Sequence, residues 1–182
     1  FTGLGCMDGE VHIKLRDDAK PVVHSPRTVP VSLRSKLKDE LKRMEELGVI
    51  VKQTEPTEWV NSLVTVVKPN GQLRVCIDPK DLNEAIQREH FPMNTVDQVA
   101  SLVGDARFFT VLDASSGYWQ LKLDEPSSKL CTFNTPFGRY RFLRLPFGVN
   151  AAPEMFQRCI STMFEGVEGV HSVQDDILNC GN

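Results

Sequence analysis

An acidic doublet close to the C-terminal end of the sequence restricts the fold more than any other feature. Asp175 and Asp176 are neighbours within "SVQDDIL", between short apolar residues that are typical of strands. Neighbouring carboxylates repel each other, and such a pair inside an apolar run indicates a cation that both can share. A third acid, Asp113, ends the strand-like segment "RFFTVLD" in the middle of the chain. Only a fold that pairs distant strands can bring these three carboxylates together.

Three carboxylates that converge from a sheet offer the hard oxygen ligands that Mg²⁺ prefers. Two such ions about 3.5–4 Å apart catalyse phosphoryl transfer by activating a hydroxyl and stabilising the leaving oxygens. Sequence spacing alone favours a plainer alternative, a solvated turn, because acids at strand ends are common. A structural Ca²⁺ site is disfavoured, since "VQDDILN" offers few oxygens in close sequence. A phosphoacceptor domain of the receiver type is also disfavoured, because its acidic pair precedes its single aspartate.

The composition is that of one globular domain. Apolar residues make up 41% of the chain and charged residues 25%, and no run of about 18 apolar residues could span a membrane. The five cysteines are scattered without a CxxC pair, which favours plain buried thiols in a reducing compartment. No secretory signal is expected at the start of the sequence. The formal charge of −3 does not indicate nucleic-acid binding, although a net charge conceals local patches.

Apolar periodicity predicts an α+β fold. Helices are predicted over residues 32–48, about 95–103 and 150–164, with Ser32 as the cap of the first helix and Gly48 at its end. Strands are predicted on both sides of the hairpin signal Asn70-Gly71, over residues 60–67 and 73–77. Residues 107–113 are expected to form a buried strand, and shorter strands are predicted over 119–123, 130–134, 140–145, from 169 to the doublet, and from 177. Helices on one face of a mainly antiparallel sheet make up this fold.

Four motifs follow one another along the chain in a characteristic order. They are "LRVCIDPKDLN", "LDASSGYWQ", "FNTPFGRYRFLRLPFGVNAAPEMFQ" and "DDIL". Their order and separations resemble the reverse transcriptase of gypsy-type LTR retrotransposons, over residues 21–181. The resemblance implies the fingers and most of the palm of a right-hand polymerase, an RNA-directed DNA polymerase. Residues 1–30 would be an extended N-terminal arm, 31–106 mostly fingers and 107–182 mostly palm, with the thumb and a ribonuclease H domain absent.

The resemblance implies a metal site made of the three acids. Asp113, Asp175 and Asp176 would be catalytic. With the backbone carbonyl of Ala114, which would also adjoin the nucleotide, they would bind two Mg²⁺ ions, or Mn²⁺ in their place. The implied partners are an RNA or DNA template with its primer, deoxynucleoside triphosphates, and the remaining polyprotein with its thumb and ribonuclease H. No membrane partner is implied, and the expected location is intracellular, in cytoplasmic virus-like particles or in the nucleus.

The resemblance also implies a nucleotide site. Arg74 would hold the triphosphate with its planar fork of donors, and Lys68 in the hairpin turn would add a point charge. The ring of Tyr118 would lie beneath the incoming sugar, where it would clash with a 2′-hydroxyl. Phe147 and Gly148 of "LPFG" would pack against the nucleotide and the template.

Other motif residues have two interpretations. Asn83 and Gln157 could serve the site, but structural hydrogen bonding explains each of them at least as well. Arg139, Arg141 and Arg144 alternate with aromatic residues in "GRYRFLRL", which suits contact with phosphates and stacking on bases. A half-exposed strand with its polar side outward explains the same alternation, and both interpretations stay open at this point.

Residues around the doublet depart from the family pattern. That pattern reads apolar-Tyr-x before the two acids, whereas this chain has Ser172, Val173 and Gln174, and it has Asn179 and Cys180 after them. Drift in a decaying element copy explains these changes better than a specialised active site. Because few residues follow the doublet, we expect the second strand of the hairpin to be barely formed and this chain alone to be weak or inactive. The alternative function is a catalytically silent, nucleic-acid-binding remnant of a retroelement.

Overall fold

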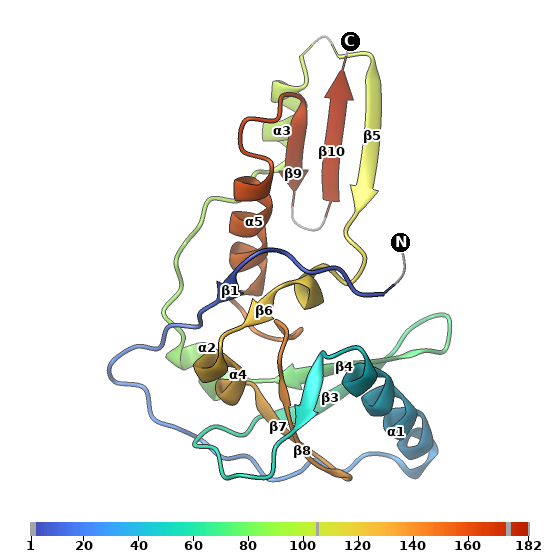
Figure 1. Cartoon of the computed structure of the whole chain (residues 1–182), viewed down its shortest axis with the longest axis vertical. Coiled ribbons are helices and arrows are strands. Elements are labelled where there is room, and N and C mark those ends of the chain that lie inside the picture. The colour runs from blue at the N-terminus through green and yellow to red at the C-terminus, as the bar shows by residue number, and fades with distance from the viewer. Residues whose placement is uncertain (1–2, 105, 174–175, 182) are drawn as a thin grey trace. The chain divides into compact units, whose positions relative to one another are not determined.

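The chain is divided into two compact units, each of which combines two separate stretches of sequence. The computed structural model describes residues 3–104, 106–173 and 176–181 (Figure 1). The first unit contains Phe1–Arg88 and Tyr118–Ala152, and the second contains Glu89–Gly117 and Pro153–Asn182. These units cut across the predicted segments, so the assignment of residues 1–30, 31–106 and 107–182 to arm, fingers and palm stays a prediction. Among the described helices, none has the length and apolar character required to cross a membrane.

Two antiparallel sheets lie at the centre of the first unit. The hairpin of β3 and β4 turns at Asn70 and Gly71, and Gly71 has φ +79°, so the predicted hairpin is confirmed. Strand β8 pairs with β2 on one side and with β7 on the other. The bounds are β2 Ile50–Lys52, β3 Ser62–Val67, β4 Leu73–Asp78, β7 Thr132–Thr135 and β8 Gly138–Phe142.

Aromatic side chains of β7 and β8 fill the core of this unit. The ring centroids of Phe133 and Phe142 are 5.0 Å apart, and the Phe133 centroid lies 6.0 Å from that of Tyr140. Fully burying side chains of this size contributes roughly 1.5–3 kcal/mol each. The two-residue period of a strand directs Tyr140 and Phe142 to the same, inner face. They are core residues and not a platform for bases, so the structure supports the plainer interpretation of "GRYRFLRL".

The long helix α1 (Val31–Glu46) packs against this core through three buried side chains, Leu37, Leu41 and Met44. The prediction that Ser32 caps this helix is wrong, because Pro30 occupies the cap position and no side chain bonds to the free backbone N–H groups there. Proline suits the start of a helix, since it has no N–H to satisfy and its φ is fixed. The predicted end is confirmed: Gly48 follows the cap residue Leu47 with φ +66°.

Residues 117–130 fold differently from the prediction. Instead of a strand over 119–123, Gly117–Gln120 form a 3₁₀ helix and only Lys122–Leu123 form a strand, β6, which pairs in parallel with β1 (Glu10–Val11). Helix α4 (Glu125–Leu130) was missed, although its start was readable in the sequence. The Asp124 carboxylate accepts a hydrogen bond from the Ser127 backbone N–H over 3.0 Å, and Pro126 lies in the first turn.

The segment before α1 is attached to the rest of the first unit through two histidine–aspartate hydrogen bonds and one ion pair. His12 contacts Asp124, and His24 contacts Asp81 at the start of the short helix α2 (Lys80–Ala85), both over 2.6 Å. A third pair joins Arg27 to the end of β4. Apart from β1 and isolated bridges, this segment has no regular structure within the described residues.

All five cysteines are free thiols. This confirms the plain thiols that their spacing predicted, but only Cys131 is fully buried, and burial raises the pKa of its thiol to about 12. Cys6 is exposed, and the remaining three are half-buried.

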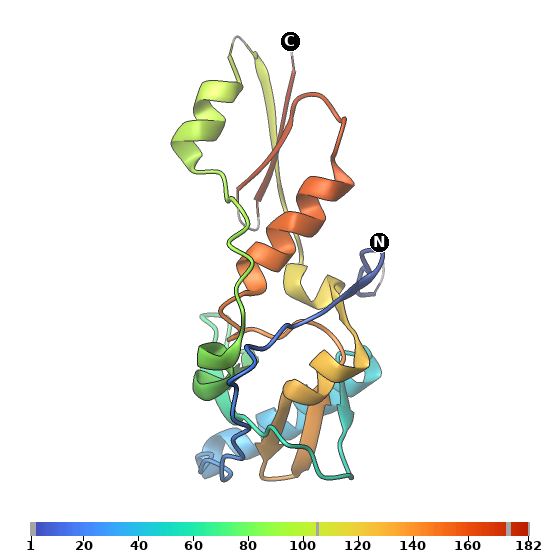
Figure 2. The same ribbon diagram turned by 90° about the vertical axis from the view of Figure 1, so that its left-hand side faces the viewer.

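The second unit contains one antiparallel sheet with β10 in the centre, β9 on one side and β5 on the other (Figure 1). Helix α3 contacts β9, and Figure 2 shows the same three strands turned by 90°. The bounds are α3 Val96–Leu102, β5 Phe108–Asp113, α5 Ala152–Met163, β9 Val170–Val173 and β10 Asp176–Gly181. The expectation that the strand after the doublet is barely formed is wrong, because all six residues of β10 pair with β5.

Strand β5 forms where it was predicted, but the prediction that it is buried is wrong. All six of its residues are exposed, including Phe108 at 70% and Val111 at 65%. A continuous apolar run usually indicates a strand covered on both faces. In the described part of the chain nothing covers either face of β5, because successive side chains point to opposite faces and both sets are exposed.

Candidate active site

The two carboxylates that the structure describes lie opposite each other in the second unit. Asp113 ends β5 and Asp176 begins β10, and their Cα atoms are partners in the antiparallel register. Residues that face each other in this way point to the same side of the sheet, with Cβ atoms about 4.5–5.5 Å apart. Both residues are exposed. Asp175, the third predicted acid, lies outside the described residues.

This pair has an unbalanced negative charge. Like charges that face each other across two strands destabilise a sheet. Within the described residues, neither carboxylate has a hydrogen-bond or ion-pair partner, and no group of three or more His, Cys, Asp or Glu side chains could hold a metal ion. Exposed, unshared oxygens on one side of the sheet suit a hard cation that waters and further ligands complete.

The turn that follows Asp113 is fixed by the close approach of helix α5. The Gly117 backbone N–H donates to the carbonyl of Ala114 over 3.0 Å. That carbonyl still has a second lone pair for another partner. A Cβ atom added to Gly117 would lie 3.0 Å from two ring atoms of Phe156. Glycine at this position therefore lets the helix hold the end of β5 in place.

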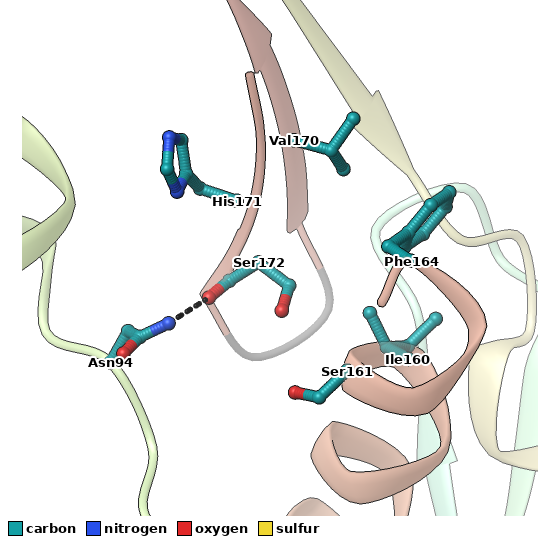
Figure 3. A pocket seen from close by; sticks show the side chains of 7 residues that line it. All are labelled: Asn94, Ile160, Ser161, Phe164, Val170, His171 and Ser172. Carbon is teal, nitrogen blue, oxygen red and sulfur yellow. Dashed lines mark hydrogen bonds between the residues drawn. The ribbon is translucent and has the colours of Figure 1, made fainter. Parts of the chain in front are cut away.

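Ser172, on β9, connects the strand before the doublet to α5 and to the segment before α3. Its hydroxyl accepts a hydrogen bond from Nε2 of Gln157 on α5 over 2.6 Å, and its carbonyl accepts one from Nδ2 of Asn94 over 3.4 Å (Figure 3). Both Ser172 and Gln157 are buried. The serine that departs from the apolar family pattern thus has a structural role here. The sequence left Gln157 open between two interpretations, and the structure supports hydrogen bonding.

A small pocket of about 170 Å³ lies beside the hydrogen bonds of Ser172. Figure 3 shows the hydroxyl-bearing side chain of Ser172 between the strand and the helix that carries Ser161. The lining residues come from α5 and the residue after it, from β9 and from the segment before α3: Asn94, Ile160, Ser161, Phe164, Val170, His171 and Ser172.

Three of the predicted nucleotide residues, Arg74, Tyr118 and Phe147, lie together in the first unit. The guanidinium carbon of Arg74, on β4, lies 4.9 Å from the Phe147 ring centroid. The Tyr118 ring lies 5.1 Å away and is tilted by 42°. A cation over an aromatic ring is attracted by its electron-rich face. The Phe147 ring therefore contacts both the arginine and the tyrosine.

The backbone beside Phe147 lies directly against β4. The Ile77 backbone N–H donates to the Phe147 carbonyl over 3.2 Å. A Cβ atom added to Gly148 would lie 2.0 Å from the Ile77 carbonyl oxygen, and Gly148 has φ +114°. Only glycine combines this backbone conformation with such a close approach.

Lys68 follows the end of β3, in the hairpin turn. Its backbone N–H donates to the Gln72 carbonyl, and its own carbonyl accepts from the Gly71 N–H, each over 2.8 Å. These bonds fix the backbone of the turn and leave the role of the Lys68 ammonium group a prediction.

The three arginines of "GRYRFLRL" bond to groups of the first unit itself. Arg139 donates to Oδ1 of Asn134, Arg141 to Oγ of Ser128, and Arg144 to the carbonyl of Trp119. Their side chains thus have internal partners, as expected for a half-exposed strand.

The structure therefore brings the candidate residues together in two groups. Arg74, Tyr118, Phe147 and Gly148 lie in the first unit, while Asp113, Ala114 and Asp176 lie in the second. The sequence did not decide whether Asn83 and Gln157 serve the site or make structural hydrogen bonds, because the bonds of an amide side chain depend on how other elements pack around it.

Comparison with known protein families gives a consistent match. Residues 66–180 match the family model described as reverse transcriptase (RNA-dependent DNA polymerase). The uncharacterized protein K02A2.6 of Caenorhabditis elegans is 34% identical over 97% of this chain. The retrovirus-related Pol polyprotein from transposon 412 of Drosophila melanogaster is 30% identical over 93% of it. The aligned region makes up 14% of each of these two relatives.

Solved structures show the same fold at low sequence identity. The foamy viral protease-reverse transcriptase in complex with double-stranded DNA superposes with a TM-score of 0.86 at 17% identity, over 98% of this chain and 31% of that one. The foamy viral enzyme in complex with an RNA/DNA hybrid gives 0.81 at 18% identity, over 96% and 23%.

Proposed function

Because this chain belongs to the reverse transcriptase family, we propose that it provides nucleotide binding and catalytic carboxylates to an RNA-directed DNA polymerase. The observation that carries this proposal is the pairing of Asp113 with Asp176 across β5 and β10. Two exposed carboxylates that face each other, with no partner among the residues that the structure describes, are unfavourable unless a cation neutralises them. The gypsy subtype stays a prediction.

The proposed reaction transfers a nucleotide to the 3′-hydroxyl of a primer. Asp113, Asp176, the neighbouring Asp175 and the carbonyl of Ala114 would hold two Mg²⁺ ions, for which Mn²⁺ can substitute. Bound ions of this kind lower the pKa of the attacking hydroxyl and stabilise the leaving oxygens. The protein contributes position: the β5–β10 register holds two carboxylates on one side of the sheet, and Phe156 and Ser172 hold the segments beside them.

The first unit would bind the incoming deoxynucleoside triphosphate. The Arg74 guanidinium offers paired donors for the phosphate oxygens, and the Phe147 ring restricts its orientation. Lys68 would add a charge near the γ-phosphate. The Tyr118 ring would exclude a 2′-hydroxyl by steric contact, which selects deoxyribonucleotides.

The proposed partners follow from the relatives. The matched structures hold double-stranded DNA and an RNA/DNA hybrid, and transposon 412 encodes a Pol polyprotein. We propose that this chain binds a primed RNA or DNA template and acts with the thumb and ribonuclease H of a polyprotein. Extension by residues 1–182 alone should be weak, because positioning the duplex is a large part of this catalysis.

One observation favours a second candidate function, binding of nucleic acid without turnover. Val173 is the register partner of Asp176 on β9, at a position where the family resemblance leads us to expect tyrosine. Loss of a ring beside the carboxylates would weaken the support for a primer end while leaving phosphate contacts intact.

Primer extension on an RNA template, with Mg²⁺ or Mn²⁺, tests both functions. We expect metal-dependent extension that Asp113→Asn and Asp175→Asn abolish, while neither change weakens binding of primer–template. Salt-dependent binding without extension, both by this chain and by this chain joined to the thumb and ribonuclease H of its polyprotein, would establish the silent remnant instead. Absence of both binding and extension would refute the polymerase proposal.

A further inference from the structure

The side chain of Asn83 holds the turn that contains Phe147 and Gly148. Its Nδ2 donates to the Gly148 carbonyl over 2.9 Å, and its Oδ1 accepts from the Asn150 backbone N–H over 2.9 Å. In return, Nδ2 of Asn150 donates to the Asn83 carbonyl over 3.2 Å. A single side chain thus bonds to the backbone on both sides of Val149, next to the residue whose carbonyl contacts β4.

The backbone of Asn83 is itself held in place by its helix. It belongs to α2, whose Leu82 and Ala85 are buried, and its backbone N–H donates to the Pro79 carbonyl over 2.7 Å. The two bonds of its side chain need one donor and one acceptor at a fixed separation, which an amide supplies. A carboxylate of the same shape lacks the donor and would place negative charge against the Gly148 carbonyl.

The held turn determines where Phe147 lies, and Phe147 contacts both Arg74 and Tyr118. We propose that Asn83 is a positioning residue for nucleotide selection: it fixes the Phe147 ring and thereby the triphosphate-binding guanidinium and the ring that excludes a 2′-hydroxyl. This inference rests on the proposed function and extends it to a residue outside the nucleotide contacts. All of these residues lie in the first unit.

The near-isosteric change Asn83→Asp separates this role from a general effect on folding. We expect the KM for a deoxynucleoside triphosphate to rise about tenfold while kcat changes less, because the Arg74 guanidinium that binds the triphosphate is no longer held in position. The preference for deoxy- over ribonucleotides, measured as the ratio of kcat/KM values, should fall by a similar factor.

Asn61→Asp is the matched control. Asn61 is also in the first unit and is buried, and its Nδ2 donates to the carbonyls of Leu130 and Thr132 over 2.8 and 2.9 Å. Its loss should lower the Tm and the fraction of active protein but leave KM and the nucleotide preference unchanged. If Asn83→Asp behaves like Asn61→Asp, Asn83 has only a structural role and the inference is overturned.

A second measurement does not depend on activity. The Ile77 amide donates to the Phe147 carbonyl, so its hydrogen exchange reports whether the turn stays against β4. We expect Asn83→Asp to speed this exchange about tenfold relative to both wild type and Asn61→Asp. If wild type extends no primer even when joined to the thumb and ribonuclease H of its polyprotein, the polymerase proposal fails by itself. This exchange still decides whether Asn83 holds the turn, and unchanged exchange would overturn the inference.

Discussion

The aromatic residues on β5 of the second unit are covered far less than the aromatic core of the first unit. In the first unit, Phe133 and Phe142 are 0% exposed, whereas Phe108 and Phe109 on β5 of the second unit are 70% and 53% exposed. The first unit therefore derives its order from a packed core. In the second unit α5 carries the buried side chains Met155, Phe156 and Ile160, but both faces of β5 are exposed and its pairing with β10 is a backbone ladder.

This contrast matters for the proposed reaction because the two groups of candidate residues lie on different supports. The nucleotide residues are carried by elements with a buried core beneath them. Of the two described carboxylates, Asp113 lies at the end of β5, which is exposed on both faces in the described structure, and Asp176 lies at the start of the partly covered β10. Local stability follows buried apolar contacts, so we expect the carboxylates to be the less rigid of the two groups.

The largest expected effect is removal of the central ring of the first unit. Phe142→Ala should lower the free energy of unfolding by about 3–5 kcal/mol, because a fully buried ring is replaced by a cavity. Phe109→Ala makes the same chemical change on exposed β5 and should cost about 1 kcal/mol or less. Urea unfolding followed by circular dichroism measures both, and the fluorescence of Trp59 and Trp119, both buried in the first unit, isolates that unit. Equal losses for the two variants would refute the contrast.

The next effect concerns the bond that supports β9. Gln157→Ala should destabilise the second unit by about 1–3 kcal/mol, because the buried Ser172 hydroxyl loses its donor. Protection of the β9 and β10 amides against hydrogen exchange measures this local change. The same Gln157 amide also donates a longer bond, over 3.3 Å, to the hydroxyl of the exposed Ser161. Ser161→Ala removes this bond and should have little effect.

A double-mutant cycle sharpens this test. If the bond between Gln157 and Ser172 is the reason for the loss, Gln157→Leu combined with Ser172→Val should cost less than the sum of the two single changes. Additive losses would show that the two residues stabilise the sheet independently.

The sequence predicted the local elements of both units better than their burial. Asn70-Gly71 indicated the hairpin and Gly48 the end of α1, because each acts through its own backbone. Burial of β5 could not be read from the sequence, since an apolar run does not show what covers it.

For the candidate site, motif order suggested which acids belong together, but the sequence does not contain the register that places Asp113 opposite Asp176. The hydrogen bonds of Asn83 and Gln157 could not be predicted from the sequence either. Each joins two different elements, and only the folded structure brings their donors and acceptors together.

The smallest expected effect is a difference in acid sensitivity between two helix caps. In the first unit the cap of α4 is Asp124. Burial raises the pKa of its carboxyl group, but hydrogen bonds from Ser127 and the contact with His12 together lower the pKa by more, so the net shift is downward. In the second unit the cap of α3 is Thr95, whose hydroxyl accepts from the Gln98 N–H over 3.2 Å without any charge.

A carboxyl group with a lowered pKa in the folded state stabilises the fold above its unfolded pKa, and this stability is lost as the pH falls through the folded pKa. Protection of the α4 amides should therefore decrease below about pH 3.9, the ordinary value for aspartate, while protection of the α3 amides should not. Asp124→Asn keeps a capping oxygen and should remove the pH dependence, whereas Asp124→Ala should cost about 0.5–2 kcal/mol at neutral pH. Thr95→Ala is the matched change on α3 and should have the same cost at every pH. Parallel acid titrations of both helices would show instead that global unfolding, and not the charge of the cap, governs the response of the first unit.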